Sequence, residues 1–338
     1  MNRPKQETRS KIRELSKDNN PLLVTRHSSP EKATRDAYGE TLIELGKQRS
    51  DIVVLDADLS GSTKTGKFAK AFPERFFNLG VSEQDMIGTA AGLALAGKVP
   101  FASTFAVFGT GRVWDQIRLV VCYSNTNVKI VTTHGGITVG EDGASHQALE
   151  DIALMRVLPN MKVIVPADAT ETSSVIKTIA DSNGPVYVRL GRSKVPHVMP
   201  DDYKFEIGKS YVFRTGRDVN IIATGIMVDI ANSAARTLTE QGIDTGVINM
   251  STIKPLDEEA LFTAAKSSRV IITAEEHSVI GGLGSAVSEF LSENYPLPVR
   301  RIGVKDEFGC SGTPGELLKL YGLTADDIVR MTKEVLKK

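Results

Sequence analysis

An apolar run that leads into a glycine-rich loop decides the fold of this chain: Val128-Lys129-Ile130-Val131-Thr132-Thr133-His134-Gly135-Gly136-Ile137-Thr138-Val139-Gly140-Glu141-Asp142-Gly143-Ala144-Ser145-His146-Gln147. The apolar part is typical of a buried strand, and the loop carries His134 and His146 with an acidic pair between them. Open α/β sheets place their ligand sites in loops that follow the carboxyl ends of strands. Imidazoles and a carboxylate on such a loop can bind a polar substrate and move its protons. The stretch therefore predicts a ligand site, and the competing interpretation is a surface turn with incidental histidines.

Apolar runs recur on both sides of this stretch and alternate with helical patterns. In the first half we predict strands at 52–55, 100–104, 161–166 and 185–190, and helices at 84–96, 111–123 and 170–181. In the second half we predict strands at 219–223, 245–250, 270–274 and 299–304, and helices at 228–241, 257–265, 283–293 and 325–337. This alternation favours parallel sheets covered on both faces. The predicted fold class is α/β, with two doubly wound domains, each a mostly parallel sheet flanked by helices.

The domain limits follow from length and local composition. A chain of 338 residues has room for two or three domains. Residues 1–30 are polar with little periodicity, which predicts an N-terminal arm, and the segment 194–210 combines two prolines with charges and no repeat. We expect the two domains to span residues 31–198 and 199–338.

Composition and charge disfavour several classes of function. The formal net charge is zero, so nothing in it favours nucleic acid or an anionic membrane as a partner. The sequence has no apolar run near the ~18 residues of a membrane span, and its charged start lacks the apolar stretch of a secretory signal. Two cysteines, Cys122 and Cys310, are too few for a disulfide framework or a thiolate metal site. These features predict a cytoplasmic protein.

Two further motifs could carry chemistry. Gly80-Val81-Ser82-Glu83-Gln84 leads into a small-residue helix, where Glu83 either stabilises the helix N-terminus or is a buried acid facing a heteroaromatic nitrogen. Phe105 and Phe108 follow a predicted strand and either pack in the core or stack against a flat cofactor ring. Neither a G-x-S-x-G elbow nor a Walker A motif occurs, which disfavours an α/β-hydrolase or a P-loop enzyme.

Taken together, these motifs occur in the order and spacing of a transketolase. The chain resembles the C-terminal half of that family, its pyrimidine-binding domain plus its C-terminal domain, from about residue 31 to the end. The resemblance rests on Ala33-Thr34-Arg35, Asp56-Ala57-Asp58-Leu59, Gly80-Val81-Ser82-Glu83-Gln84, Gly140-Glu141-Asp142-Gly143-Ala144-Ser145-His146-Gln147 and Leu190-Gly191-Arg192. It implies a transferase of the pentose phosphate pathway that uses thiamine diphosphate to move a two-carbon ketol unit from a ketose phosphate to an aldose phosphate.

The resemblance also implies a partner subunit. Transketolases hold the diphosphate and its Mg²⁺ in an N-terminal domain with a Gly-Asp-Gly motif and a downstream Asn. Here Glu141-Asp142-Gly143 has the wrong first residue, and two predicted domains leave no residues for a third. We therefore expect one subunit of a split enzyme, whose N-terminal transketolase subunit holds thiamine diphosphate and Mg²⁺ or another divalent cation. Self-association is expected to give an α2β2 heterotetramer.

Roles at the cofactor are carried over from the family residue by residue. The glutamate matching Glu83 hydrogen-bonds the pyrimidine N1′ and so controls the cofactor's tautomer, which makes it a catalytic residue. Phe105 and Phe108 match the aromatics that pack on the pyrimidine ring. Gly111 stands where the family has a third aromatic, which leaves the pocket looser or filled from elsewhere. Asp58 resembles an acidic residue near the cofactor and the subunit interface.

Roles at the substrate come from the same resemblance. His134 matches the catalytic histidine that contacts the donor ketose near the reacting carbon, and Asp142 matches the aspartate that binds a sugar hydroxyl next to the carbonyl. The cluster expected around the sugar phosphate comprises Arg35, Ser62, His146 and Arg192. Guanidinium forks match phosphate geometry, which makes such a clamp chemically sensible. Taken singly, each arginine could equally be a surface salt bridge and Ser62 a helix cap.

Three other functions remain open at this point. The β subunit of a 2-oxoacid dehydrogenase E1 component shares the domain pair and the split arrangement. It would not need His134, Asp142, His146 and a double-arginine phosphate clamp, which suit a phosphorylated polyol. A deoxyxylulose-phosphate synthase has a similar loop, but normally within a longer chain. A non-catalytic α/β regulatory subunit would not need to retain Glu83, His134 and His146.

Overall fold

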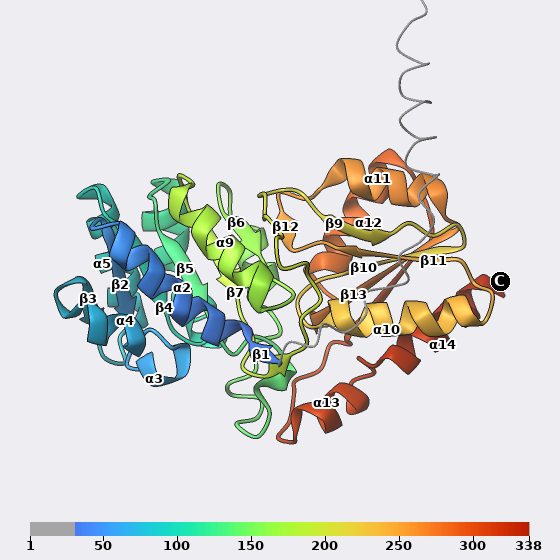
Figure 1. Ribbon diagram of the computed structural model, residues 1–338, viewed down its shortest axis with the longest axis horizontal. Coiled ribbons are helices and arrows are strands. Elements are labelled where there is room, and N and C mark those ends of the chain that lie inside the picture. The colour runs from blue at the N-terminus through green and yellow to red at the C-terminus, as the bar shows by residue number, and fades with distance from the viewer. Residues whose placement is uncertain (1–30, 338) are drawn as a thin grey trace, which may run out of the picture.

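The computed structural model describes residues 31–337, so the predicted N-terminal arm lies outside the described residues. The described chain forms two α/β units side by side, drawn from blue to green and from yellow to red in Figure 1. Each unit contains a mostly parallel sheet with helices on both faces. The predicted fold class is therefore confirmed.

The first sheet has seven strands in the order β12-β6-β7-β5-β4-β2-β3. All neighbouring strands are parallel except β12, which runs antiparallel to β6 and comes from the second half of the chain. The strands are β2 Ile52–Asp56, β3 Phe76–Asn78, β4 Val99–Ser103, β5 Lys129–Thr132, β6 Lys162–Ile164, β7 Val186–Arg189 and β12 Thr252–Lys254. A short antiparallel pair, β1 Lys32–Ala33 and β8 Lys194–Val195, joins the start of the described chain to the end of this unit.

Two helices, α2 and α9, pack together over one face of this sheet, and α5 and η2 cover the other. The Tyr38 hydroxyl and the Ser103 hydroxyl are 2.7 Å apart, which ties α2 to the end of β4. The helical segments are α2 Thr34–Gln48, α3 Ser60–Thr63, α4 Gly66–Ala71, η1 Pro73–Arg75, α5 Glu83–Leu95, α6 Ala106–Thr110, α7 Trp114–Gln116, η2 Ile117–Tyr123, η3 Ile137–Val139, α8 Asp151–Arg156 and α9 Ala169–Asp181.

Two segments differ from the sequence prediction. The helix predicted at 111–123 consists of the short α7 and a π-helical turn, η2. The helix α2 was not predicted, because Gly39 and Gly46 interrupt its pattern. Both glycines are needed for packing: a Cβ at Gly39 would lie 2.7 Å from Lys64, and one at Gly46 would lie 2.5 Å from the Phe72 ring.

The second sheet has five strands in the order β14-β13-β10-β11-β9, of which β9 alone is antiparallel to its neighbour. Helices α10 and α14 pack on one face, and α11 and α12 pack on the other. The elements are β9 Tyr211–Arg214, β10 Val219–Ala223, β11 Thr245–Asn249, β13 Val270–Ser278, β14 Val299–Val304, α10 Met227–Glu240, α11 Glu258–Ser267, α12 Leu283–Asn294, α13 Pro314–Leu320 and α14 Ala325–Leu336.

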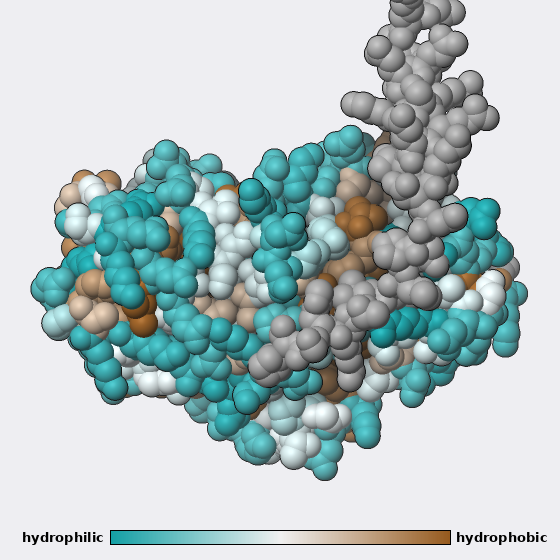
Figure 2. Space-filling view, viewed as in Figure 1, coloured by the Kyte–Doolittle hydropathy of each residue, from teal (hydrophilic) through white to brown (hydrophobic). Residues whose placement is uncertain are grey.

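A continuous apolar core joins the two units. One cluster of buried side chains includes Ile87 of α5 and Met155 of α8 together with Leu261 of α11 and Val287 of α12. Burial of such apolar surface is the main stabilising term in folding, so the two units stabilise one another. Within residues 31–337, none of the helices is both long and apolar enough to cross a membrane. Figure 2 shows a mostly hydrophilic face with small, separated hydrophobic patches.

Candidate active site

The candidate site lies at the carboxyl edge of the first sheet. Strands β2, β4, β5 and β7 are parallel neighbours, so the loops that follow them meet at one edge. These loops carry Asp58, Phe105, His134 and Arg192. The opening prediction of a ligand site after the strand at 128–133 therefore matches the topology.

Four aromatic rings meet in these loops. The Phe105 ring stacks on His134, with centroids 3.7 Å apart and an interplanar angle of 22°. It lies nearly parallel to Phe108 at 6.0 Å. The His146 ring meets Phe108 edge-on at 5.5 Å and Phe105 at 6.1 Å. The two predicted histidines and the two predicted phenylalanines thus form one aromatic cluster, in which Phe108 is half-buried.

His134 is buried and surrounded by positive charge. Burial, reinforced by Arg35, Arg192, His146 and Lys64, lowers the pKa of its imidazole to about 3. Its Nε2 lies 3.2 Å from Arg35 Nη1, and its Nδ1 lies 2.8 Å from the Thr133 hydroxyl. A guanidinium only donates, so Nε2 accepts and Nδ1 carries the proton. The imidazole is therefore neutral, with its tautomer assigned from its neighbours.

Protein groups accept hydrogen bonds from only part of the Arg35 guanidinium. Its Nη1 donates to the Ser62 carbonyl at 3.0 Å, whereas its Nε is buried without a partner among the described residues. Burial lowers the pKa of this group, and the nearby charge of Arg192 acts in the same direction. A buried, unsatisfied donor beside a second guanidinium is suited to an anionic or oxygen-rich ligand.

Arg192 is partly neutralised by the glycine-rich loop. Its Nη1 lies 3.4 Å from a Glu141 oxygen and 3.7 Å from an Asp142 oxygen, and it also donates to the Val139 carbonyl. The predicted sugar ligand Asp142 is thus beside the predicted phosphate ligand Arg192. Each could still contact a substrate, because the exposed fraction is 43% for the Asp142 side chain and 35% for that of Arg192.

The loop after β2 is built by a buried carboxylate. Asp56 accepts hydrogen bonds from the Thr63 and Thr65 hydroxyls at 2.7 and 2.8 Å and from the Leu59 N–H at 2.6 Å. These contacts place the Ser62 carbonyl on Arg35 and set Lys64 among the charges that act on His134. Lys64 was not predicted from the sequence, where its position two residues after Ser62 was the signal that could have identified it.

Asp58 stands apart from the cluster. It adopts a left-handed backbone, with a φ of 64°, and forms a reciprocal pair with Asn78. Among the contacts between described residues, those of Asp58 lead toward β3 and not to Glu83, Phe105 or His134. Its predicted role at the cofactor and the subunit interface stays a prediction.

Glu83 joins the cluster through a residue that sequence analysis missed. Its side chain is 3% exposed, and its Oε1 accepts a hydrogen bond from Arg112 Nη1 at 2.8 Å. The Arg112 guanidinium carbon lies 4.3 Å from the centroid of the Phe108 ring. Arg112 therefore bridges the Glu83 carboxylate and the face of Phe108. A continuous series of contacts now links Glu83, through the aromatic rings, to Arg35.

The second unit shapes the glycine-rich loop. Glu276 of β13 accepts a hydrogen bond from the Thr138 N–H at 2.6 Å, and Arg189 of β7 donates to the Glu276 carbonyl at 2.7 Å. Gln147 donates to the Cys310 carbonyl at 2.9 Å. Gly136 has a φ of 84°, and a Cβ there would lie 2.2 Å from the Glu276 carboxyl. Only glycine fits this turn without a clash or backbone strain. The turn places the loop against the second unit.

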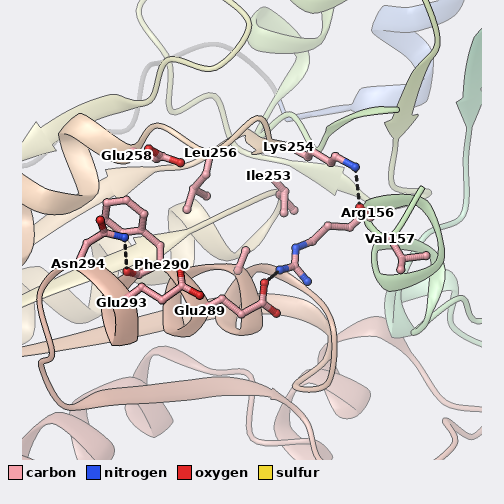
Figure 3. Close-up of a pocket in the computed structure, with 11 residues that line it drawn as sticks. Arg156, Val157, Ile253, Lys254, Leu256, Glu258, Glu289, Phe290, Glu293 and Asn294 are labelled. Atoms are coloured by element: carbon pink, nitrogen blue, oxygen red, sulfur yellow. Dashed lines mark hydrogen bonds and ion pairs between the residues drawn. The ribbon is translucent and has the colours of Figure 1, made fainter. Parts of the chain in front are cut away.

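A separate cleft of about 600 Å³ lies at the junction of the two units, lined by α8, β12 and α12. Figure 3 shows that its cations are bound by the protein itself, Arg156 by Glu289 and Lys254 by the Arg156 carbonyl. It contains none of the predicted site residues. Over the described range, no three His, Cys, Asp or Glu side chains are grouped so as to hold a metal ion.

Comparisons with known proteins match the two units to two domain families. Residues 30–198 match the pyrimidine binding domain of transketolase, and residues 208–328 match the transketolase C-terminal domain. A solved structure described as a split gene transketolase, an inactive beta4 tetramer, superposes with a TM-score of 0.84. It is 55% identical, over 91% of this chain and 99% of that one.

Several curated relatives are similar over almost their whole length. A putative transketolase C-terminal section from Methanocaldococcus jannaschii is 54% identical, over 91% of this chain and 97% of the relative. A 6-deoxy-6-sulfo-D-fructose transketolase subunit from Clostridium sp. is 43% identical, over 90% and 94%. One of the subunits of an apulose-4-phosphate transketolase from Phocaeicola vulgatus is also 43% identical, over 90% and 98%.

Proposed function

Because the chain belongs to the transketolase family, as the C-terminal subunit of a split transketolase, we propose that it transfers a two-carbon ketol unit between anionic sugars together with an N-terminal partner subunit. The observation that carries the proposal is the continuous cluster from Glu83 to Arg35. Its acidic end suits a cofactor ring, its cationic end suits a substrate anion, and the neutral His134 lies between them.

The residues present fit the pyrimidine end of thiamine diphosphate. Glu83 is a nearly buried acceptor. Arg112, which donates to it, also lies over the face of Phe108, and the Phe108 ring is stacked with that of Phe105. When bound, thiamine diphosphate supplies the nucleophilic carbon and electron sink that ketol transfer requires. Glu83 would hold a proton at the ring nitrogen that faces it, and the two phenylalanines would fix the ring plane. Mg²⁺ and the diphosphate would be held by the partner subunit.

The cationic end supports an anionic sugar as substrate. Arg35, His146 and Arg192 surround His134, and the unsatisfied Arg35 Nε offers a donor to a ligand oxygen. The relatives named for a sulfonated fructose and for apulose 4-phosphate both take their names from a sugar with an anionic group. We assign phosphate as the anion, with Ser62 beside it, Asp142 on a sugar hydroxyl and His134 near the reacting carbon.

The proposed assembly is an α2β2 heterotetramer in the cytoplasm, active in the pentose phosphate pathway. The inactive beta4 form of the solved relative fits a subunit that needs its partner for activity. Within this chain, residues 31–198 would form the pyrimidine-binding domain and residues 199–338 the C-terminal domain. Asp58 would lie near the cofactor and the subunit interface.

The test is reconstitution. The chain is co-expressed with the product of a neighbouring gene that carries a Gly-Asp-Gly motif and a downstream Asn, and the purified complex is assayed for ketol transfer with and without thiamine diphosphate. We expect transfer between sugar phosphates only with both subunits and the cofactor. Oxidative turnover of a 2-oxoacid in place of ketol transfer would instead indicate a dehydrogenase component, and inactivity of a correctly assembled complex would favour a regulatory subunit.

A further inference from the structure

Arg112 makes two contacts at once that a flat cationic ring would make at the same place. Its Nη1 donates to Glu83 Oε1 at 2.8 Å, and its guanidinium lies 4.3 Å from the Phe108 ring centroid. A guanidinium is planar, positively charged and rich in N–H donors, so it satisfies a carboxylate and an aromatic face together. A protonated aminopyrimidine ring has the same three properties.

The two groups therefore compete for one place. Glu83 is 3% exposed, so its carboxylate without a counter-charge would cost free energy whenever the cofactor is not bound. The Arg112 side chain is 46% exposed, which leaves it a path to solvent. Its backbone is held independently, because Gln84 Nε2 donates to the Arg112 carbonyl at 3.2 Å. The side chain can move while the loop stays in position.

We propose that Arg112 is a built-in placeholder for the cofactor's pyrimidine ring: it neutralises Glu83 and covers Phe108 in the cofactor-free protein, and it must swing out before the ring can bind. The inference rests on the proposed function, since it requires thiamine diphosphate as the ligand. It gives Arg112 a role in controlling access of the cofactor and in stabilising the cofactor-free protein.

The placeholder lowers the apparent affinity for the cofactor. A protein whose binding-competent conformation is only fractionally populated binds its ligand more weakly, by that fraction. The fraction here is set by an ion pair and a cation–π contact, so removing the guanidinium should tighten binding roughly three- to thirtyfold. The same change should lower the melting temperature of the cofactor-free protein and enlarge the increase that cofactor produces.

The experiment compares the complex of this chain and its N-terminal partner in four forms: wild type, Arg112→Ala, Arg112→Gln and Arg118→Ala. Arg118 is an exposed arginine in the neighbouring η2 turn and serves as the matched control. Arg112→Gln keeps much of the side-chain stem and provides a second variant if the alanine variant folds poorly. Thiamine diphosphate is titrated into each cofactor-free complex with Mg²⁺ present by calorimetry, and melting curves are recorded with and without it.

We expect tighter binding and a lower cofactor-free melting temperature in both Arg112 variants, with Arg118→Ala like wild type. Equal or weaker binding by the Arg112 variants, with wild type and control binding normally, would overturn the placeholder and leave the proposed function intact. Absence of binding in all four complexes, wild type included, would instead contradict the proposed function.

Discussion

Arg35 Nη1 lies 3.2 Å from His134 Nε2, and this contact sets the protonation of the central imidazole. The arginine comes from the first turn of α2 and the histidine from the loop after β5, so the fold joins residues 99 positions apart. Because the guanidinium must donate, Nε2 has to accept, and a proton on that nitrogen would be repelled. A substrate oxygen that took the place of His134 on Arg35 would free Nε2 and link substrate binding to proton position.

The low pKa of His134 predicts a stability that depends on pH. The folded imidazole has a pKa of about 3, below the ~6.5 of an unfolded histidine, so between these values the unfolded chain binds the additional proton. Unfolding is then favoured as the pH falls, by about 1.4 kcal/mol per pH unit from this residue.

His134→Asn tests that dependence, because asparagine tolerates the left-handed backbone found at His134, where φ is 61°. The excess stability of wild type over the variant should shrink by about 1.6 kcal/mol between about pH 6.5, where the unfolded histidine is already half protonated, and about pH 5. Urea unfolding of both proteins at about pH 6.5 and about pH 5 measures it. A gap that stays constant would show that His134 titrates alike in the folded and unfolded chain.

Glu83→Gln should reduce turnover of the reconstituted enzyme by roughly a hundred- to ten-thousandfold. The amide matches the carboxylate in shape, but it carries no charge to hold a proton at the facing ring nitrogen. Steady-state rates give the result, with co-purification of the partner subunit as the control for assembly. Activity close to that of wild type would show that Glu83 does not hold the proton at the cofactor's ring nitrogen.

Arg192→Ala should distinguish a phosphate clamp from a salt bridge. In the structure Arg192 pairs with Glu141 and Asp142, so a purely structural role would affect all substrates alike. If it binds the substrate anion, kcat/KM for a phosphorylated acceptor should fall about ten- to a hundredfold, and the value for glycolaldehyde should change much less. Equal losses for the two acceptors would show that Arg192 has a purely structural role, through its ion pairs with Glu141 and Asp142.

Gly136→Ala should destabilise the isolated subunit and distort the site loop. The new Cβ would meet the Glu276 carboxyl at 2.2 Å, and the backbone φ of 84° is unfavourable for alanine. We expect a loss of at least about 1 kcal/mol in the free energy of unfolding. Gly88→Ala is the matched control, since its Cβ would meet nothing within 4 Å, and it should be neutral or stabilising. Equal behaviour of the two variants would contradict the tight contact between loop and second unit.

The sequence predicted those parts of the fold whose signal is local. The strands β2, β4, β5, β7, β10, β11 and β13 were expected near their observed positions. Their side chains are almost all buried, and each strand contains a short apolar stretch. Helix α2 was missed because its two glycines are chosen by tertiary contacts with Lys64 and Phe72. The antiparallel strand β12 was missed because it pairs with a strand of the other unit.

The site residues show the same contrast between local sequence patterns, which could be predicted, and tertiary contacts, which could not. Five ordered motifs, with the phenylalanine pair, located the groups at Glu83, Phe105, Phe108, His134 and His146, and the structure brings these together. Arg112 was missed because its partner lies 29 residues earlier in the chain and no local pattern marks the pair. Arg189 also escaped prediction. It donates to Asp151 Oδ2 at 2.8 Å and to the Glu276 carbonyl at 2.7 Å, and these contacts exist only when β7, α8 and β13 are adjacent in space.

This subunit is proposed to supply only the pyrimidine side of a shared cofactor site. Titration of thiamine diphosphate with Mg²⁺ into the isolated subunit, and then into its complex with the N-terminal partner, tests that claim most directly. We predict no binding in the micromolar range by the isolated subunit and saturable binding by the complex. Micromolar binding by the isolated subunit, or none by the complex, would contradict it.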